Sequence, residues 1–495
     1  MKNLTKLLLD KEYTIAEAGS RLYSTFVEHL GRCVYEGIYE PDHPCADSQG
    51  FRKDVRELVK ELRFGAIRYP GGNFVSGYNW LDGIGRREDR PKRLDYAWSS
   101  IEPNLVGIDE FCDYAKSVNS EVMYAVNMGT GTPQDAGYIV EYANFPGGTS
   151  YSDLRIKNGR KDPHNIKLWC IGNEMDGPWQ TCHLDAVDYG KKALETAKIM
   201  KWIDPSIELV VCGSSTSKQP TYPEWDRIVL EYTYDKVDYL SLHRYYENFG
   251  NELDFLASYH EMDAFIKTGI ATADYVKSIK RSKKTMMLSF DEWNIWYQTR
   301  TQMKQWEFAP HILEDNYSLL DAVAFGGLLC TLINNADRVR IACLAQMVNV
   351  IAPIFTEKGG KAIRQTIFYP FAMAARNCTG TVLRTVGRAQ TLESEAYGTV
   401  SALPHAATYN AERGEVSVLC GNISGEPQTL VLDMRSFGTV RWIEHQVLAG
   451  DLSAVNTFEN PDRVRTVFVD EGAGETDSPD VILPPKSFHL LRFKV

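Results

Sequence analysis

The chain has 495 residues, 44% of them hydrophobic, and its formal net charge at pH 7 is −11. A chain of this length can bury a large core and exceeds the usual size of one domain, so we expect two domains. The negative charge, together with the lack of a long basic stretch, argues against nucleic acid as a partner.

No segment of the sequence indicates export or membrane insertion. The leucine triplet Leu7–Leu9 near the N-terminus is too short for the hydrophobic region of a signal peptide, and no apolar run is long enough to cross a membrane. Ten cysteines stand singly, without a CxxC pair. Single cysteines favour buried thiols over a disulfide or zinc framework. We therefore expect a cytoplasmic protein without a metal or another cofactor.

The first residues indicate two short strands, Leu4–Leu9 and Tyr13–Ile15, which precede any repeating unit. After them, apolar runs alternate with segments of helical periodicity. Eight runs have the character of buried strands: Leu22–Val27, Ala66–Tyr69, Glu121–Val126, Lys167–Ile171, Glu208–Cys212, Tyr239–Leu242, Thr285–Phe290 and Val339–Leu344. The helical segments are Phe51–Arg63, Gly107–Val118, Asp135–Ala143, Asp185–Ile203, Glu224–Tyr234, Leu253–Lys280, Glu314–Asn335 and Lys361–Arg376.

This alternation is typical of an α/β protein with a (β/α)8 TIM barrel. The alternative is an open doubly wound sheet, but no GxGxxG motif opens a helix after the first strand. Beyond about residue 385 the pattern changes to short alternating strands separated by turn signals, which indicates a β-sandwich or jelly-roll domain. These strands are Ala406–Tyr409, Val416–Cys420, Gln428–Leu432, Val440–Ile443, Arg465–Phe468 and Ser487–Phe493.

The sequence therefore predicts three parts. Residues 1–18 supply N-terminal strands that join the β-sandwich, residues 19–385 form the catalytic barrel, and residues 386–495 form the β-sandwich domain. Barrel active sites form at the C-terminal ends of the strands, so the residues just past each strand are the candidates for function.

Two glutamates follow predicted strands in polar surroundings. Glu174 stands in Trp169–Gln180, behind the fourth strand, and Glu292 in Asp291–Asn294, behind the seventh. Two carboxylates presented in this way are what hydrolysis of a glycosidic bond requires, because one protonates the leaving oxygen and the other attacks or activates water. The alternative is that each glutamate forms a structural ion pair.

Two further motifs are Phe26–Arg32 and Arg68–Phe74. All four segments resemble the corresponding motifs of the family 51 α-L-arabinofuranosidases. The resemblance extends over essentially the whole chain. It implies a retaining, exo-acting hydrolase that removes terminal non-reducing α-L-arabinofuranosyl groups from arabinan- or arabinoxylan-derived oligosaccharides. It also implies a homo-oligomer, usually a hexamer.

The resemblance assigns Glu174 as the general acid/base and Glu292 as the nucleophile of a double displacement. It assigns sugar binding to Glu28, Arg68, Asn73, Asn173, Tyr245 or Tyr246, and Gln346. We favour Tyr245, because it lies on the same side of an alternating strand as His243. Glu247 stands where the family would have glycine, so the loop after the sixth strand differs.

Other interpretations remain for single residues and for the whole chain. Arg68 and Glu28 could be structural ion-pair partners, and Gln346 a satisfied core amide. His243 has no HxH or HxxxH partner, so a hydrogen-bonding role is favoured over metal ligation. The alternative functions are an endo-β-glucanase or β-xylosidase on the same barrel, a metal-dependent barrel enzyme, and a non-catalytic sugar-binding protein.

Overall fold

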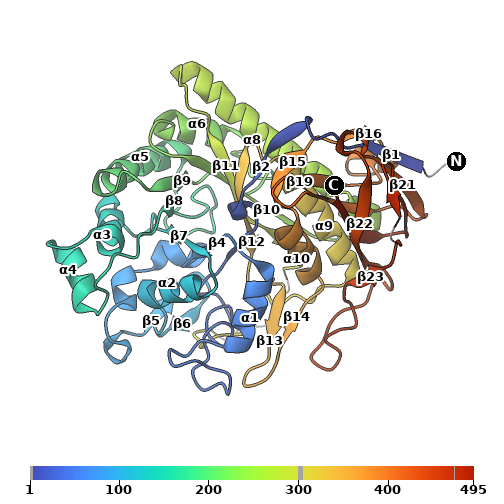
Figure 1. Cartoon of the computed structure of the whole chain (residues 1–495). Helices are drawn as coiled ribbons and strands as arrows, with labels where there is room; N and C mark the ends of the chain where they lie inside the picture. Colours follow the sequence, from blue (N-terminus) through green and yellow to red (C-terminus); the bar gives the residue numbers. More distant parts are fainter. Residues whose placement is uncertain (1–3, 299–304, 473) are drawn as a thin grey trace.

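The computed structural model describes residues 4–298, 305–472 and 474–495. Its larger part is a closed barrel of parallel strands surrounded by helices (Figure 1). The barrel strands are β3 (Ser24–Phe26), β4 (Ala66–Tyr69), β7 (Glu121–Ala125), β8 (Leu168–Ile171), β9 (Glu208–Val211), β10 (Tyr239–Tyr246), β11 (Met287–Ile295) and β12 (Val339–Ala345). Each overlaps one of the eight predicted runs, so the predicted barrel is confirmed.

The helices cover the outside of the barrel with their apolar faces. In α1 (Lys53–Leu62), the residues Val55, Leu58, Val59 and Leu62 follow the helical period and are all buried. The other α-helices are α2 (Ile108–Ser117), α3 (Pro133–Asn144), α4 (Ser150–Lys157), α5 (Ala186–Ile203), α6 (Glu224–Thr233), α7 (Glu252–Leu256), α8 (Tyr259–Lys280), α9 (Leu319–Asn334) and α10 (Phe368–Asn377). Helix α4 was not predicted.

Helix α9 is buried on nearly all sides. It packs against the barrel strand β11 and also against β20 (Glu415–Asn422) and β26 (Ser487–Lys494) of the C-terminal sheet. A Cβ atom at Gly326 would lie 2.3 Å from the Phe488 ring, so this close approach of helix and sheet requires glycine. The barrel and the C-terminal sheets therefore share one continuous core.

The C-terminal part contains two larger sheets, whose strands are orange and red in Figure 1 apart from the two blue N-terminal strands. The smaller sheet has the order β16 (Val386–Arg388), β1 (Leu4–Leu8), β21 (Gln428–Asp433) and β25 (Asp480–Leu483). The larger sheet has the order β2 (Thr14–Ala18), β15 (Gly380–Leu383), β19 (His405–Asn410), β20, β26, β22 (Val440–Leu448) and β23 (Val467–Val469), with β24 (Glu475–Thr476) beside β22. The two N-terminal strands thus enter different sheets.

Strand β15 lies within the range that the sequence assigned to the barrel, yet it pairs with β2 and β19 in the larger sheet. Three short hairpins extend from the core: β5 (Arg93–Asp95) with β6 (Ser100–Glu102), β13 (Ile354–Thr356) with β14 (Ala362–Arg364), and β17 (Thr391–Ser394) with β18 (Gly398–Ser401).

Two of the predicted helices were partly wrong. The segment Lys361–Arg376 begins as strand β14, because it pairs with β13 across a turn that contains Gly359 at φ +65°, and only α10 is helical. The segment Leu253–Lys280 is not one helix, since it is interrupted at Ala257 and Ser258 between α7 and α8.

Two predicted strands were too short. The sequence ended the sixth and seventh strands at Leu242 and Phe290, but β10 and β11 continue because they pair with each other from His243–Glu292 to Tyr246–Ile295. Glu292 therefore lies inside a strand. Among the described residues, all ten cysteines are free thiols, and no helix is long and apolar enough to cross a membrane.

Candidate active site

The two glutamates come together at the C-terminal end of the barrel. Glu174 follows β8 and has a left-handed backbone, φ +43°, which is uncommon for a residue other than glycine. Glu292 is held by β11 between β10 and β12. Side-chain oxygens of Glu174 and Glu292 and a ring nitrogen of His243 lie within 4.8 Å of one another. Closure of the barrel therefore brings the two carboxylates close together at the C-terminal end of the strands.

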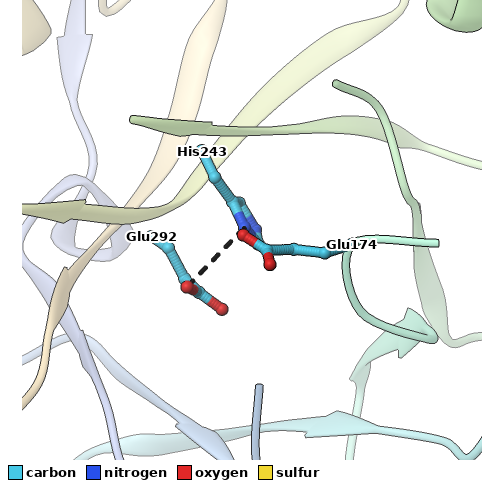
Figure 2. Close-up of side chains that lie close together, drawn as sticks. All are labelled: Glu174, His243 and Glu292. Carbon is cyan, nitrogen blue, oxygen red and sulfur yellow. Dashed lines mark hydrogen bonds and ion pairs between the residues drawn. The ribbon is translucent and has the colours of Figure 1, made fainter. Parts of the chain in front are cut away.

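The His243 ring lies beside both carboxylates (Figure 2). Its Nδ1 is 2.9 Å from Oε1 of Glu174 and 3.7 Å from Oε2 of Glu292. Burial lowers the pKa of His243, but the charges of Glu292, Asp291 and Glu174 outweigh burial and raise this pKa to about 10. His243 is therefore a cation at neutral pH, and it reduces the repulsion between the two glutamates.

Asp291 holds the opposite edge of this ring. Its Oδ1 is 3.5 Å from Nε2 of His243, and it accepts a hydrogen bond of 2.5 Å from Ser241 Oγ. Burial raises the pKa of Asp291, but Arg68 and His243 hold it below its usual value. The ionised Asp291 therefore favours the protonated ring of His243.

Arg68, at the end of β4, contacts the nucleophile candidate directly. Its Nη1 donates to Oε1 of Glu292 at 2.7 Å, and its Nη2 donates to Oδ1 of Asn173 at 2.6 Å. Burial and the charge of Glu174 raise the pKa of Glu292 above its usual value, although His243, Arg68 and Tyr245 oppose this rise. The structure thus places Arg68 and Asn173 together beside Glu292.

The two tyrosines of β10 point to different partners. The Tyr245 hydroxyl donates to Oε2 of Glu292 at 2.8 Å, whereas the Tyr246 hydroxyl donates to Oε2 of Glu261 at 2.9 Å. Burial, and then the charge of Glu292, raises the pKa of Tyr245 well above its usual value, so this hydroxyl keeps its proton. Tyr245 is the tyrosine beside the glutamates.

Glu28, which follows β3, also lies in the site. Its Oε1 accepts from the Phe74 N–H at 2.9 Å and from the Trp98 indole N–H at 3.0 Å, and Gln346 Nε2 is 3.4 Å from Oε2. Burial raises the pKa of Glu28 to about 8. A Cβ atom at Gly72 would lie 2.5 Å from Glu28 Oε2, so any larger residue at this position would have to displace the Glu28 carboxylate.

A cavity of about 1140 Å³ opens over these groups. Among the described residues, its walls include both glutamates and four of the predicted sugar-binding residues, namely Glu28, Asn73, Tyr245 and Gln346. Arg68, which contacts Glu292, and Asn173, which contacts Arg68, are buried and are not among its lining residues. The sequence alone does not tell which of the predicted sugar-binding residues line the cavity and which are buried.

Of the tryptophans near the motifs, some line the cavity and one is buried in the core. Trp98, Trp179 and Trp296 line the cavity, while Trp293 is buried and packs against Phe325 with ring centroids 4.8 Å apart. Trp179 also donates its indole N–H to Oε2 of Glu174 at 2.6 Å. This contact was not predicted, although Trp179 lies in the same motif as Glu174.

Comparison with known proteins identifies the family. Residues 58–265 match the model of the alpha-L-arabinofuranosidase 1 domain, and residues 291–487 match that of the alpha-L-arabinofuranosidase C-terminal domain. An "Intracellular exo-alpha-(1->5)-L-arabinofuranosidase" of Acetivibrio thermocellus is 53% identical over 90% of this chain and 90% of its own. The chain belongs to the family 51 α-L-arabinofuranosidases. It is thus a glycoside hydrolase.

Solved structures of the same family share the whole fold of this arabinofuranosidase. The family 51 enzyme AbfB of Bifidobacterium longum superposes with a TM-score of 0.95 at 41% identity and covers 100% of both chains. An arabinose complex of the Thermotoga maritima α-L-arabinofuranosidase has a TM-score of 0.89 at 31% identity and covers 99% of this chain and 100% of its own.

Glu174, His243 and Glu292 of the arabinofuranosidase are close enough together to hold a cation. The same carboxylates that would attract a metal raise the pKa of His243 to about 10, so a metal would have to displace a proton from this ring in order to bind. The sequence favoured hydrogen bonding for His243, but it gave no signal for a cation beside the two glutamates.

Proposed function

We propose that this arabinofuranosidase removes terminal non-reducing α-L-arabinofuranosyl groups with retention of configuration. The observation that supports retention is the proximity of the Glu174 and Glu292 oxygens, within 4.8 Å. Retaining glycosidases place their carboxyl groups about 5–5.5 Å apart, whereas inverting enzymes need about 6.5–9.5 Å to admit a water molecule.

The reaction proceeds in two displacements. In the first, Glu292 attacks the anomeric carbon while Glu174 donates a proton to the glycosidic oxygen, so the leaving sugar departs as an alcohol. In the second, Glu174 takes a proton from water, and the water oxygen displaces Glu292 from the anomeric carbon. The overall change is the addition of one water molecule across the glycosidic bond.

The neighbouring residues act on Glu292 or on the sugar. Arg68 and Tyr245 stabilise the ionised nucleophile, and Asn173 holds Arg68 in place. Glu28, Asn73 and Gln346 line the cavity, and their polar groups can accept from or donate to sugar hydroxyls. The positive charge of His243 lowers the pKa of Glu292 and so opposes burial and the charge of Glu174, which raise it.

The relatives support the substrate class. The Acetivibrio thermocellus protein is named for an exo-acting, intracellular activity on α-(1->5)-linked arabinofuranosides. We propose that this chain acts likewise in the cytoplasm on oligosaccharides derived from arabinan, and also on those from arabinoxylan. We also propose that it assembles as a homo-oligomer, with the hexamer suggested by the resemblance.

The stereochemistry can be tested by running the reaction on 4-nitrophenyl α-L-arabinofuranoside in aqueous methanol. Retention predicts methyl α-L-arabinofuranoside in the proton NMR spectrum, while a β product would refute the double displacement. The aryl β-glucopyranoside and β-xylopyranoside assayed in parallel test the alternative function, and faster turnover of either would favour it.

A further inference from the structure

Glu174 stands on a turn that follows β8 and not within a strand. β8 ends at Ile171, and the turn closes where the Gly177 N–H donates to the Glu174 carbonyl at 2.8 Å. The backbone of Glu174 has φ +43°, which residues other than glycine adopt only where surrounding contacts enforce it. The position of the Glu174 carboxyl group therefore depends on the contacts that hold this turn.

Asp176, two residues after Glu174, connects the turn to the segment after β9. Its Oδ2 accepts from both the N–H and the Oγ of Ser215, each at 2.9 Å. Asp176 is only 7% exposed, and its Oδ1 is buried without a hydrogen-bond partner among the described residues. Burial of an unpaired carboxylate oxygen costs free energy, so packing alone does not favour an aspartate at this position.

The segment that Asp176 contacts is also fixed to β10. The Ser214 carbonyl accepts from the His243 N–H at 3.3 Å, and Nδ1 of the His243 ring lies 2.9 Å from Oε1 of Glu174. The backbone of Ser214 and Ser215 thus connects the turn of Glu174 with the strand that carries His243. Loss of the contact between Asp176 and Ser215 would therefore loosen the turn relative to this strand.

A second aspartate makes the same pair of hydrogen bonds to the preceding serine. Asp226 Oδ1 accepts from the Ser214 N–H at 2.7 Å and from its Oγ at 3.0 Å. Asp226 belongs to α6 and is fully buried, so it fixes the segment to a helix on the outside of the barrel. Two adjacent serines thus make like contacts to different elements, and only the contact of Ser215 leads to the turn of Glu174.

The side chain of Asp176 is charged at neutral pH. Burial raises its pKa to about 6 against the hydrogen bonds from Ser215, and the negative charge of Glu174 contributes to this rise. Hydrogen bonds to an ionised carboxylate are shorter and stronger than those between neutral groups. The contact with Ser215 is therefore stronger than an uncharged acceptor such as asparagine would make.

We propose that Asp176 is a positioning residue for the general acid/base, because it holds the turn on which Glu174 presents its carboxyl group to the glycosidic oxygen. Asp176 is not among the described residues that line the cavity, so it acts through Glu174 and not on the substrate. The inference rests on the proposed function and adds to it the contact that keeps the acid in place.

The test uses the difference between two leaving groups. Arabinobiose needs the acid, because a sugar alcohol leaves, whereas 4-nitrophenolate departs with little protonation. We expect Asp176→Ala to lower kcat/KM for α-1,5-linked arabinobiose on the order of 100-fold, the loss that a misplacement of about 1 Å can cause. For 4-nitrophenyl α-L-arabinofuranoside, kcat/KM should fall less than about threefold. Asp176→Asn keeps an oxygen acceptor for Ser215 and should lose about tenfold on arabinobiose.

Azide gives a second readout that a merely structural role would not change. Glu174 acts as the base toward water when the covalent intermediate is hydrolysed, but azide attacks this intermediate without a base. Azide should therefore raise kcat of Asp176→Ala on the nitrophenyl substrate and leave kcat of the wild type unchanged.

The matched controls are Asp226→Ala and Asp226→Asn, which change the like contact to Ser214. Any loss of activity in these controls should be equal on the two substrates, because Asp226 does not contact the turn of Glu174. Glu174→Ala is the reference for complete loss of the acid. The unfolding temperature of each variant shows whether it is folded under the assay conditions.

The possible outcomes separate the two proposals. If the Asp176 variants keep the wild-type ratio of kcat/KM between the two substrates, Asp176 does not position the acid. An equal change of this ratio in the Asp226 variants would also overturn the inference, because the effect would not be specific to the turn. If Glu174→Ala itself keeps the wild-type ratio, the proposed function is refuted instead. Asp176→Asn preserves the size of the side chain, so it provides the test even if Asp176→Ala fails to fold.

Discussion

Replacing Tyr245 with phenylalanine tests the electrostatics of the nucleophile. The change removes one hydroxyl that donates to Glu292 at 2.8 Å in a buried site. A hydrogen bond to a charged group contributes about 1.5–3 kcal/mol, and one pKa unit corresponds to about 1.4 kcal/mol. The pKa of Glu292 should therefore rise by about one to two units.

The sign of the effect follows from which form is stabilised. Tyr245 favours ionised Glu292, so without it the carboxylate is protonated at higher pH, and the acid limb of kcat/KM moves to higher pH. At a fixed pH on this limb, kcat/KM should fall about ten- to hundredfold. The plateau should change less, because the nucleophile loses its charge in the transition state.

The assay is the pH profile of kcat/KM on 4-nitrophenyl α-L-arabinofuranoside. Tyr246→Phe is the matched control, because it removes the same group from the next residue of β10, where the hydroxyl bonds to Glu261 instead. An acid limb that stays in place or moves to lower pH would refute the reasoning, as would an equal shift in the control.

Three further predictions concern the acid, the backbone under Glu28 and the metal alternative. Glu174→Ala should slow natural arabinosides far more than aryl substrates with good leaving groups, and added azide should restore the rate; equal losses on both would contradict the assignment of the acid. Gly72→Ala should lower kcat on the order of 100-fold, because its Cβ atom would displace Glu28, whereas Gly425→Ala, with open space at its Cβ, should be neutral. Full activity should survive exhaustive dialysis against EDTA, and loss of activity restored by a divalent cation would support the metal-dependent alternative.

Much of the barrel could be predicted because its signals are local. Apolar runs such as Ala66–Tyr69 become buried strands, and the spacing of Val55, Leu58 and Leu62 specifies one helix face. The exceptions are segments whose conformation depends on a partner. Residues at the start of one predicted helix form strand β14 instead, because they pair with β13 through backbone hydrogen bonds.

Within the site, the sequence supplied the residues and the alternation of β10, which favoured Tyr245. It could not show that Arg68 and Asn173 are buried against each other rather than in the cavity wall. That distinction depends on which side chains meet when strands from distant parts of the chain close into a barrel.

The sequence by itself thus determined the order of strands and helices, the change to a sandwich, and the two glutamates, because periodicity and motifs are properties of neighbouring residues. Only the tertiary structure decided that a His243 cation lies beside those glutamates and that Tyr397 reaches their cavity. Both depend on distances between residues remote in the chain, and such distances are set by closure of the barrel and by the packing of the C-terminal domain against it.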